Sequence, residues 1–280
     1  MKTPSAGAAL SWPAAGVHLS TPYFDTVRKV LAGLDPAIWP THAQLNELAR
    51  QRGICNARGE PIRFVAADAG SVHYEMRIAT HGEIATRDNW HDLFNAVQWL
   101  AFPRSKAVIS ELHAQSLATG GDAEARDRSV QRDVLTLFDE NGLVVFSTRP
   151  ELLELVRGFR WRELFVDHRE AVKRCMRWFL AGHGVLEKTL YPYVGLTAKA
   201  LLFEVDDDYL LAEGAAQVAR ADALAADWIM RPEHLSSPRN LHPLPLLGIP
   251  GWDERNESPS FYDDVHYFRP GYSRDLRGAA

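Results

Sequence analysis

The chain has 280 residues, of which 46% are hydrophobic and 24% are charged, and its formal net charge is −5. This composition excludes a disordered chain, which combines few apolar residues with a high net charge. The net negative charge argues against a broad basic surface that binds duplex nucleic acid, but it is compatible with a local basic patch. We expect a single globular domain over residues 1–280, with residues 1–18 as a flexible leader.

The two cysteines and the N-terminal residues indicate in which cellular compartment the protein is expected. Cys55 and Cys175 are far apart and neither belongs to a Cys-x-x-Cys pair, so we expect no disulfide framework and no cysteine zinc site. Two prolines interrupt MKTPSAGAALSWPAAG, which makes it a poor signal peptide. No window reaches the roughly 18 continuous apolar residues of a membrane span. These features predict a cytoplasmic protein without a membrane partner.

Two short helices are expected in the first part of the chain. TPYFDTVRKVLAGL has Thr21 as a cap, Pro22 in the first turn and apolar residues at helical spacing. In THAQLNELARQRG, Thr41 and Gln44 have the spacing of a capping box, and Gly53 ends the helix.

A β-hairpin followed by a helix is expected next. IRFVAA and VHYEMRIAT are rich in β-formers, and His81-Gly82, between MRIAT and EIAT, could form the turn of a hairpin. A helix then begins at residue 88 or 89 and ends at Phe102, and a further helix starts with Pro103 in its first turn.

The second half combines one more hairpin with several helices. In DVLTLFDENGLVVFS, Asn141-Gly142 between two apolar runs is the strongest hairpin signal of the chain. Several helices are expected from Pro150 to Tyr191, then a strand at AKALLFEV and a last helix at AEGAAQVARADALAADW.

The final segment, residues 231–280, has seven prolines and many large apolar residues. The prolines exclude long helices, and the apolar residues are too many for a free linker. We interpret it as an extended strap packed on the domain. The predicted fold class is therefore α+β: a mostly helical single domain with two short β-hairpins and a long irregular C-terminal strap.

The strongest candidate site lies in RDNWHDLFNAVQW, where a helix presents polar residues between large aromatics. At 3.6 residues per turn, His91, Asn95 and Gln98 share one stripe, with Asp88 and Asp92 beside it. A narrow polar stripe between apolar surfaces is half-buried and needs partners. Two interpretations are open: His91 and Asn95 are satisfied core groups that clamp the hairpin to the helix, or they belong to a site.

The preceding hairpin could supply the partners, since His73 and Glu75 would share one strand face. A hairpin packed on a helix resembles the unit in which histidine-metal finger nucleases hold a divalent cation, because imidazole and oxygen donors suit such metals. On this hypothesis, the order and spacing of the residues assign the role of catalytic base to His73 or His81. His91, Asn95 and Asn89 would be the ligands of one divalent metal ion.

Further polar residues are candidates for ligand binding. Asp92 and Gln98 flank the same helix stripe, and Asp263 and His266 lie in the aromatic part of the strap, which could reach the site if the strap crosses the domain near His91. Arginines in the strap, Arg231, Arg239, Arg269 and Arg274, could clamp a phosphate or form ordinary salt links.

GHGVLEKT is not a phosphate-binding loop, because Glu187 stands where the second glycine is required. We expect a helix in which Gly182 and Gly184 permit close packing. His183 and Glu187 are four residues apart, as in half of a metal site or a hydrogen-bonded pair. The acidic run Asp206–Asp208 is interpreted as a solvated turn or a helix N-terminus.

Four segments carry a family resemblance: NWHDLFNAVQWLAFPRSKA, GHGVLEKTLYPYVGLTAKALL, HLSSPRNLHPLPLLGIPGW and FYDDVHYFRP. With them the chain resembles, from about Tyr74 onward, an uncharacterised bacterial family, domain of unknown function number 3025. The resemblance implies a bacterial protein with one large domain, and it implies no particular activity.

Two functions from different classes follow from these patterns. The first is a metal-dependent hydrolase or a phosphoester-binding site on the hairpin-helix unit, with a small-molecule or phosphate-containing ligand. The second is a non-catalytic binding or scaffold protein, in which the strap covers the domain and an exposed remnant docks a partner.

Overall fold

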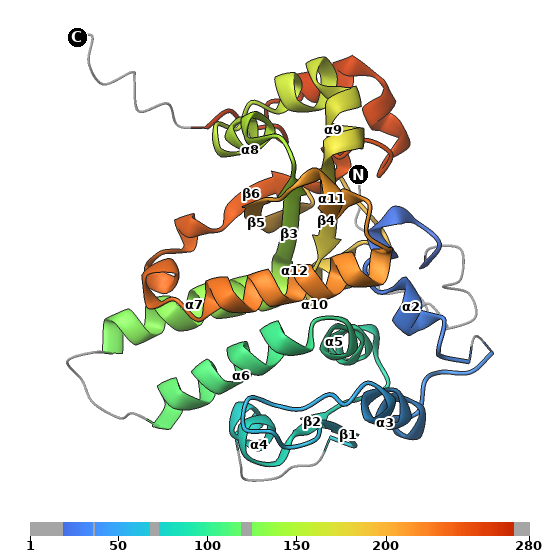
Figure 1. Cartoon of the computed structure of the whole chain (residues 1–280), viewed down its shortest axis with the longest axis vertical. Helices are drawn as coiled ribbons and strands as arrows, with labels where there is room; N and C mark the ends of the chain where they lie inside the picture. The colour runs from blue at the N-terminus through green and yellow to red at the C-terminus, as the bar shows by residue number, and fades with distance from the viewer. Residues whose placement is uncertain (1–18, 36, 68–72, 119–124, 272–280) are drawn as a thin grey trace.

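A computed structural model describes residues 19–35, 37–67, 73–118 and 125–271, with backbone only at 125–128 (Figure 1). The predicted leader and Arg274 lie outside these residues. The helices are α2 (Arg28–Leu31), α3 (His42–Gln51), α4 (Tyr74–His81), α5 (Trp90–Ala101), α6 (Pro103–Ala118), α7 (Ala125–Asn141), α8 (Pro150–Arg157), α9 (Arg169–Cys175), α10 (His183–Lys188), α11 (Asp207–Leu210) and α12 (Gly214–Ile229). The strands are β1 (Arg63–Val65), β2 (Glu83–Ala85), β3 (Gly142–Ser147), β4 (Met176–Leu180), β5 (Thr197–Glu204) and β6 (His242–Pro245). None of the helices in this part of the chain is long and apolar enough to cross a membrane.

Short helical turns complete the described chain. They are η2 (Pro22–Phe24), a π-helical turn η3 (Glu163–Asp167), η4 (Pro232–Ser236), η5 (Pro238–Asn240), η6 (Leu246–Gly248), η7 (Glu254–Glu257) and η8 (Pro259–Asp263). The α+β class with mostly helical content is thus confirmed.

A four-stranded sheet in the order β4-β3-β5-β6 forms the centre of the fold. β3 pairs parallel with β5 and antiparallel with β4, and β6 pairs antiparallel with β5. Since side chains alternate along a strand, Leu143 and Val145 of β3 enter one hydrophobic core, whereas Val144 and Phe146 enter a second. Both faces of β3 are therefore buried, which explains its continuous apolar sequence.

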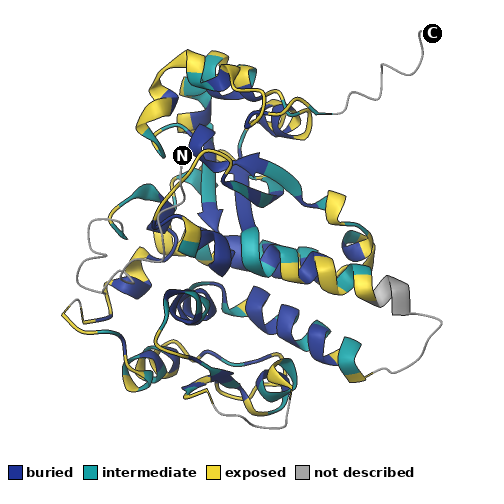
Figure 2. Ribbon diagram, turned by 180° about the vertical axis from the view of Figure 1, so that it is seen from behind, coloured by how far each residue is buried: buried dark blue, intermediate teal, exposed yellow. Residues whose placement is uncertain are grey.

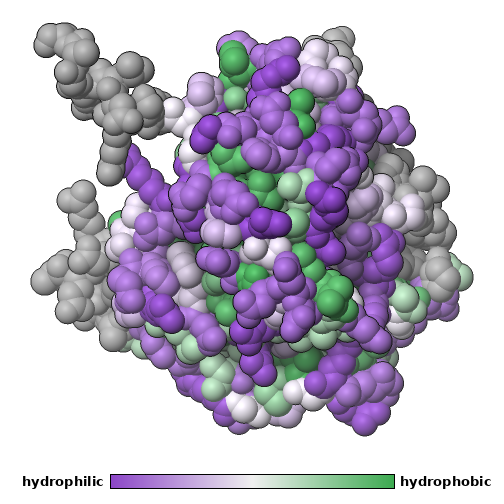
Figure 3. Space-filling view, turned by 45° about the horizontal axis from the view of Figure 1, so that its top comes forward, coloured by the Kyte–Doolittle hydropathy of each residue, from purple (hydrophilic) through white to green (hydrophobic). Residues whose placement is uncertain are grey.

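The helices divide around this sheet. In Figure 1, α8, α9 and the turns η7 and η8 lie above the sheet, α7 and α12 lie across its lower part, and α5, α6, α4 and the β1-β2 pair follow below. α6 contacts both α12 and α4. Figure 2 shows that buried residues follow the sheet and the helices beneath it, and Figure 3 shows polar side chains over most of one face, with small apolar patches between them.

Identifiable capping groups satisfy the N-terminal ends of the helices α5 and α6. The Asn89 side chain caps α5 by accepting a hydrogen bond from the Asp92 backbone N–H (2.9 Å). α6 begins at Pro103, and buried Asp222 of α12 accepts hydrogen bonds from the backbone N–H groups of Arg104 (2.9 Å) and Ser105 (2.8 Å). A buried carboxylate thus satisfies the open donors at the start of α6.

The first expected hairpin is wrong. The segment around MRIAT forms α4, not a strand, and β1 and β2 on either side of it pair in parallel. Glu75, Ile78 and Ala79 have the helical spacing that places them toward the interior. Gly82, at φ 65°, ends the helix in a left-handed conformation, so His81-Gly82 is a helix stop and not a hairpin turn. The unit before α5 is therefore strand-helix-strand.

The second expected hairpin is also wrong. DVLTLFDEN is the end of α7, with Val134, Leu135 and Phe138 buried on one helix face, and the chain passes directly into β3 at Gly142. A Cβ on Gly142 would overlap the Phe138 carbonyl oxygen, so this sharp change of direction requires glycine. Several helices do form between Pro150 and Tyr191, and the strand β4, which the sequence did not indicate, lies between α9 and α10.

The C-terminal segment packs on the domain, with buried Leu235, Leu241, Leu244, Leu246, Leu247, Ile249, Tyr262, Tyr267 and Phe268. The Tyr267 hydroxyl donates to the Leu196 carbonyl (2.7 Å) and accepts from the Leu247 N–H (3.0 Å). The segment is more regular than expected, because it contributes β6 and a series of short helical turns.

We predict that Gly182→Ala lowers the free energy of unfolding by about 2 kcal/mol, because a Cβ there would overlap the backbone at Gly142. Urea denaturation measures the loss. Gly214→Ala is the matched control: nothing lies within 4 Å of the added Cβ, so stability should stay the same or rise by less than about 1 kcal/mol. Equal effects of the two variants would contradict the close contact.

Candidate metal centre

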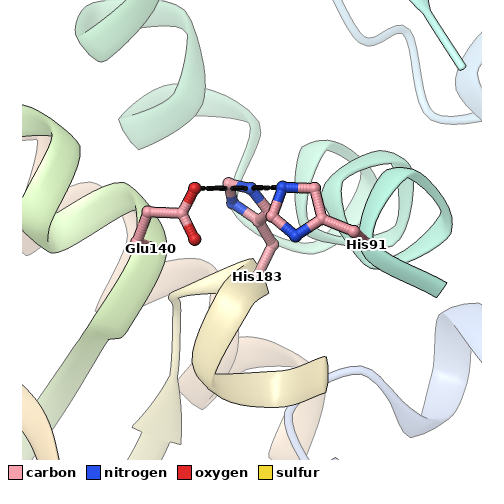
Figure 4. A group of neighbouring side chains, drawn as sticks. All are labelled: His91, Glu140 and His183. Carbon is pink, nitrogen blue, oxygen red and sulfur yellow. Dashed lines mark hydrogen bonds and ion pairs between the residues drawn. The ribbon is translucent and has the colours of Figure 1, made fainter. Parts of the chain in front are cut away.

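Three side chains from three helices meet at one point: His91 from the first turn of α5, Glu140 from the last turn of α7 and His183 from the start of α10 (Figure 4). The two Nε2 atoms lie 3.2 Å apart. Glu140 Oε1 lies 3.4 Å from His183 Nε2 and 3.9 Å from His91 Nε2. Two imidazole nitrogens and a carboxylate oxygen this close together could hold a metal ion.

Two glycines allow α10 to approach the end of α7. The backbone N–H groups of Ala181 and Gly182 both donate to the Gly142 carbonyl (2.9 Å each). A Cβ on Gly184 would overlap the carboxylate of Glu140. The predicted role of Gly182 and Gly184 in close packing is confirmed, and the packing places His183 beside Glu140.

Each imidazole is also held from its other side. His183 Nδ1 lies 2.9 Å from the Asp139 carbonyl oxygen, and His91 Nδ1 lies 3.0 Å from Glu187 Oε2. Because carbonyl and carboxylate oxygens only accept hydrogen bonds, both Nδ1 atoms must carry the proton. Both Nε2 atoms of the neutral rings then present lone pairs toward each other and toward Glu140. Such a group of three acceptors is repulsive unless a proton or a cation lies between them.

The three residues form part of the wall of a cavity of about 470 Å³. The wall also holds the ion pair between Lys106 Nζ and Asp139 Oδ1 (2.6 Å). Arg132 lines the cavity without an ion pair to any other described residue. The cavity thus combines ionisable groups of both signs with a possible metal position, as catalytic pockets do.

Burial and neighbouring charges set the protonation states around the cavity. Burial, with the nearby Asp139 carboxylate, raises the pKa of Glu75 to about 7. Burial alone would raise the pKa of Asp139, but Lys106 and then His183 outweigh it and hold this pKa below its usual value. His183, whose Nε2 can donate to Glu140 Oε1 only when that nitrogen carries a proton, lowers the pKa of Glu140 despite its partial burial. Near neutral pH, Glu140 is therefore ionised, whereas Glu75 is close to half protonated.

Four of the residues predicted as catalytic, ligand-binding or metal-binding line this cavity together: His73, His91, Asp92 and Asn95. His73 lies just before α4 and not on a strand. Asp92 is held by Arg87 (2.8 Å), so its carboxylate is already paired. Asn95 donates to the Tyr74 hydroxyl (2.9 Å), and its buried Oδ1 has no hydrogen-bond partner among the described residues.

The other candidates do not meet there. Asn89 caps α5, and Gln98 is fully buried, where it donates to the Leu180 carbonyl (3.0 Å). His81 Nδ1 lies 2.6 Å from the Thr80 hydroxyl at the end of α4. Asp263 accepts from Arg162 (2.6 Å) and His266 is exposed. Neither strap residue is among those that line the cavity.

Sequence reasoning missed two members of the group, Glu140 and His183, as partners of His91. Glu140 was hidden because its segment was assigned to a hairpin. His183 had been considered together with Glu187, four residues later. In the structure both contact His91, through Nε2 and Nδ1 respectively, instead of pairing with each other.

Fold and site together define a mostly helical α+β protein with a His-Glu-His group that could hold a metal ion. Residues 62–272 match the family described as Protein of unknown function (DUF3025), and the chain belongs to that family. No curated protein and no solved structure matches the chain.

Glu75 generates a prediction for the pH dependence of stability. Its pKa is raised from 4.5 to about 7 in the folded protein, because burial and then Asp139 raise it by more than Lys106, Ser110 and Arg132 lower it. Between these two pH values the unfolded chain has released a proton that the folded protein keeps. The free energy of unfolding therefore falls as pH rises, by at most about 1.4 kcal/mol per pH unit from this group.

Glu75→Gln should remove this slope and stabilise the protein relative to wild type above pH 7. Urea denaturation from pH 4.5 to 8, with a chelator present, measures the difference between the two proteins. A constant difference across this range would contradict the raised pKa.

Proposed function

We propose that the protein is a divalent-metal-dependent hydrolase of a small phosphate ester, with His91, Glu140 and His183 as the metal ligands. The observation that carries the proposal is the convergence of two imidazole Nε2 atoms and one carboxylate oxygen within 4.8 Å at the wall of a cavity. Three protein ligands leave a position for water or substrate, which is typical of a catalytic site and not of a closed structural one.

The spacing of the atoms supports a metal ion. Two nitrogens bound to one tetrahedral zinc ion at about 2.0–2.1 Å lie about 3.3–3.4 Å apart. The two shorter separations in the group are 3.2 and 3.4 Å. Both imidazoles also donate their Nδ1–H to an oxygen of Glu187 or of the Asp139 backbone, which is the usual outer arrangement around metal-bound histidines.

The cavity wall supports a phosphate ester as substrate. Arg132 supplies a guanidinium without a carboxylate partner among the described residues, and a guanidinium can donate two parallel hydrogen bonds to a phosphate. A divalent ion held by the three ligands would polarise a water molecule or a phosphoryl oxygen. Glu75, with a pKa of about 7, is suited to accept or return a proton in the same cavity.

Metal binding is tested by titrating chelator-treated protein with Zn²⁺ or Mn²⁺ in a calorimeter. We expect one ion per chain in wild type. Glu187→Gln should weaken binding by about tenfold, because it removes an outer hydrogen bond. Glu140→Gln, which keeps the side-chain shape, should weaken it by about 100-fold or more. The exposed control His266→Ala should bind as wild type does. Equal binding by all four proteins, or none by wild type, would contradict the metal site.

Hydrolysis is tested with p-nitrophenyl phosphate and bis(p-nitrophenyl) phosphate and the metal-loaded protein. We expect turnover that is lost in Glu140→Gln, and Arg132→Ala should raise KM about tenfold by removing the phosphate contact. Arg239→Ala, an exposed arginine that does not line the cavity, is the matched control. Metal binding without turnover of either ester would overturn the assigned activity and leave the metal site standing.

A further inference from the structure

A second and larger cavity, of about 1050 Å³, lies at the other end of α5 from His91. It is bounded by α2, the segment after α3, the junction of α5 and α6, β4 and α12. Its apolar wall is formed by Val30, Ile54, Leu100, Ala101, Pro103, Trp178, Phe179, Ala215, Val218 and Ala219. None of the residues that line it also lines the cavity beside the metal centre. This second cavity is therefore independent of the proposed metal centre.

Positive charge gathers around this apolar wall. Lys29, Arg52, Arg104, Arg177 and Arg220 line the cavity, and none of them forms an ion pair with another described residue. Its two lining carboxylates are already engaged: Asp25 pairs with Arg28, and Asp222 accepts from the start of α6. The whole chain has a net charge of −5, so five unpaired cations in one groove do not reflect a generally basic surface.

Arg52 shows the imbalance most clearly. Its guanidinium donates to the Leu100 carbonyl (3.1 Å), and no carboxylate pairs with it. Partial burial of this group lowers the pKa of Arg52. The residue is also exposed to solvent, so an anion that enters the groove can reach this guanidinium without breaking an ion pair.

We propose that this groove binds a fatty-acid anion, with the aliphatic chain on the apolar wall and the carboxylate at Arg52. The volume lies near the upper end of small-ligand pockets and suits a flexible chain. Ala215 and Ala219 of α12 line the groove together with Phe179, and both alanines are exposed, so methylene groups can pack against them. An uncharged apolar ligand would bring no counter-charge to the surrounding cations, and a small inorganic anion would leave the apolar wall exposed to water.

The test compares three probes by calorimetry on the full chain: decanoate below its micelle concentration, neutral 1-decanol and acetate. We expect decanoate to bind at one site, with decanol and acetate weaker by about tenfold or more. Ala219→Trp, which fills the groove, and Arg52→Leu, which removes the head-group contact, should each weaken decanoate by about tenfold. Arg239→Leu is the control outside the groove and should change nothing.

Several outcomes would overturn this assignment. These are equal decanoate affinity in Ala219→Trp and wild type, equal affinity for decanol and decanoate, and binding only to vesicles of anionic phospholipid. Far-ultraviolet circular dichroism of each variant checks that it is folded. Glu140→Gln should bind decanoate as wild type does, so a failure of the metal centre and a failure of this groove give different patterns.

Discussion

The close contact between α10 and the end of α7 is the constraint on which the candidate metal centre depends. Gly182 and Gly184 lie against Gly142 and Glu140, where side chains would overlap backbone or carboxylate atoms. The pairing of β3 with β4 brings these two segments together, because α7 leads into β3 and α10 follows β4. Contact of α10 with α5 then places His183 beside His91. The close backbone contact between α10 and the end of α7 thus fixes the distances between the candidate ligand atoms.

The cavity beside the candidate metal centre is lined by several ionisable side chains, which are uncommon in a protein interior. Burying charge costs stability even when it is paired, and replacing a buried ion pair by apolar residues is often neutral or stabilising. One cavity is lined by the Lys106–Asp139 ion pair, by Glu75 with its raised pKa, and by Asn95, whose Oδ1 has no hydrogen-bond partner in the part of the chain that the structure describes. A fold that needed only stability would be better served by apolar groups, whereas a site that binds and transforms a ligand requires these polar ones.

Local signals in the sequence predicted those parts of the fold that short-range physics decides. The capping box at Thr41, the cap at Asn89 and the start of α6 at Pro103 all depend on residues within one helical turn. The two hairpins failed because an apolar run next to Gly82 or Gly142 satisfies a strand pattern and a helix pattern equally, and packing decides between them. His91 was found because aromatic neighbours mark its stripe, but its partners lie 49 and 92 residues away in sequence. Only the order of the strands brings such distant residues together.

The most direct test of the metal centre is anomalous X-ray diffraction from crystals grown with Zn²⁺. We expect one anomalous peak within about 2.0–2.2 Å of His91 Nε2, His183 Nε2 and a Glu140 oxygen. Glu187 and the Asp139 carbonyl should keep their hydrogen bonds to the outer ring nitrogens. A direct contact between the two Nε2 atoms, with no anomalous density between them at saturating Zn²⁺, would show that a proton holds the pair and would contradict the metal centre.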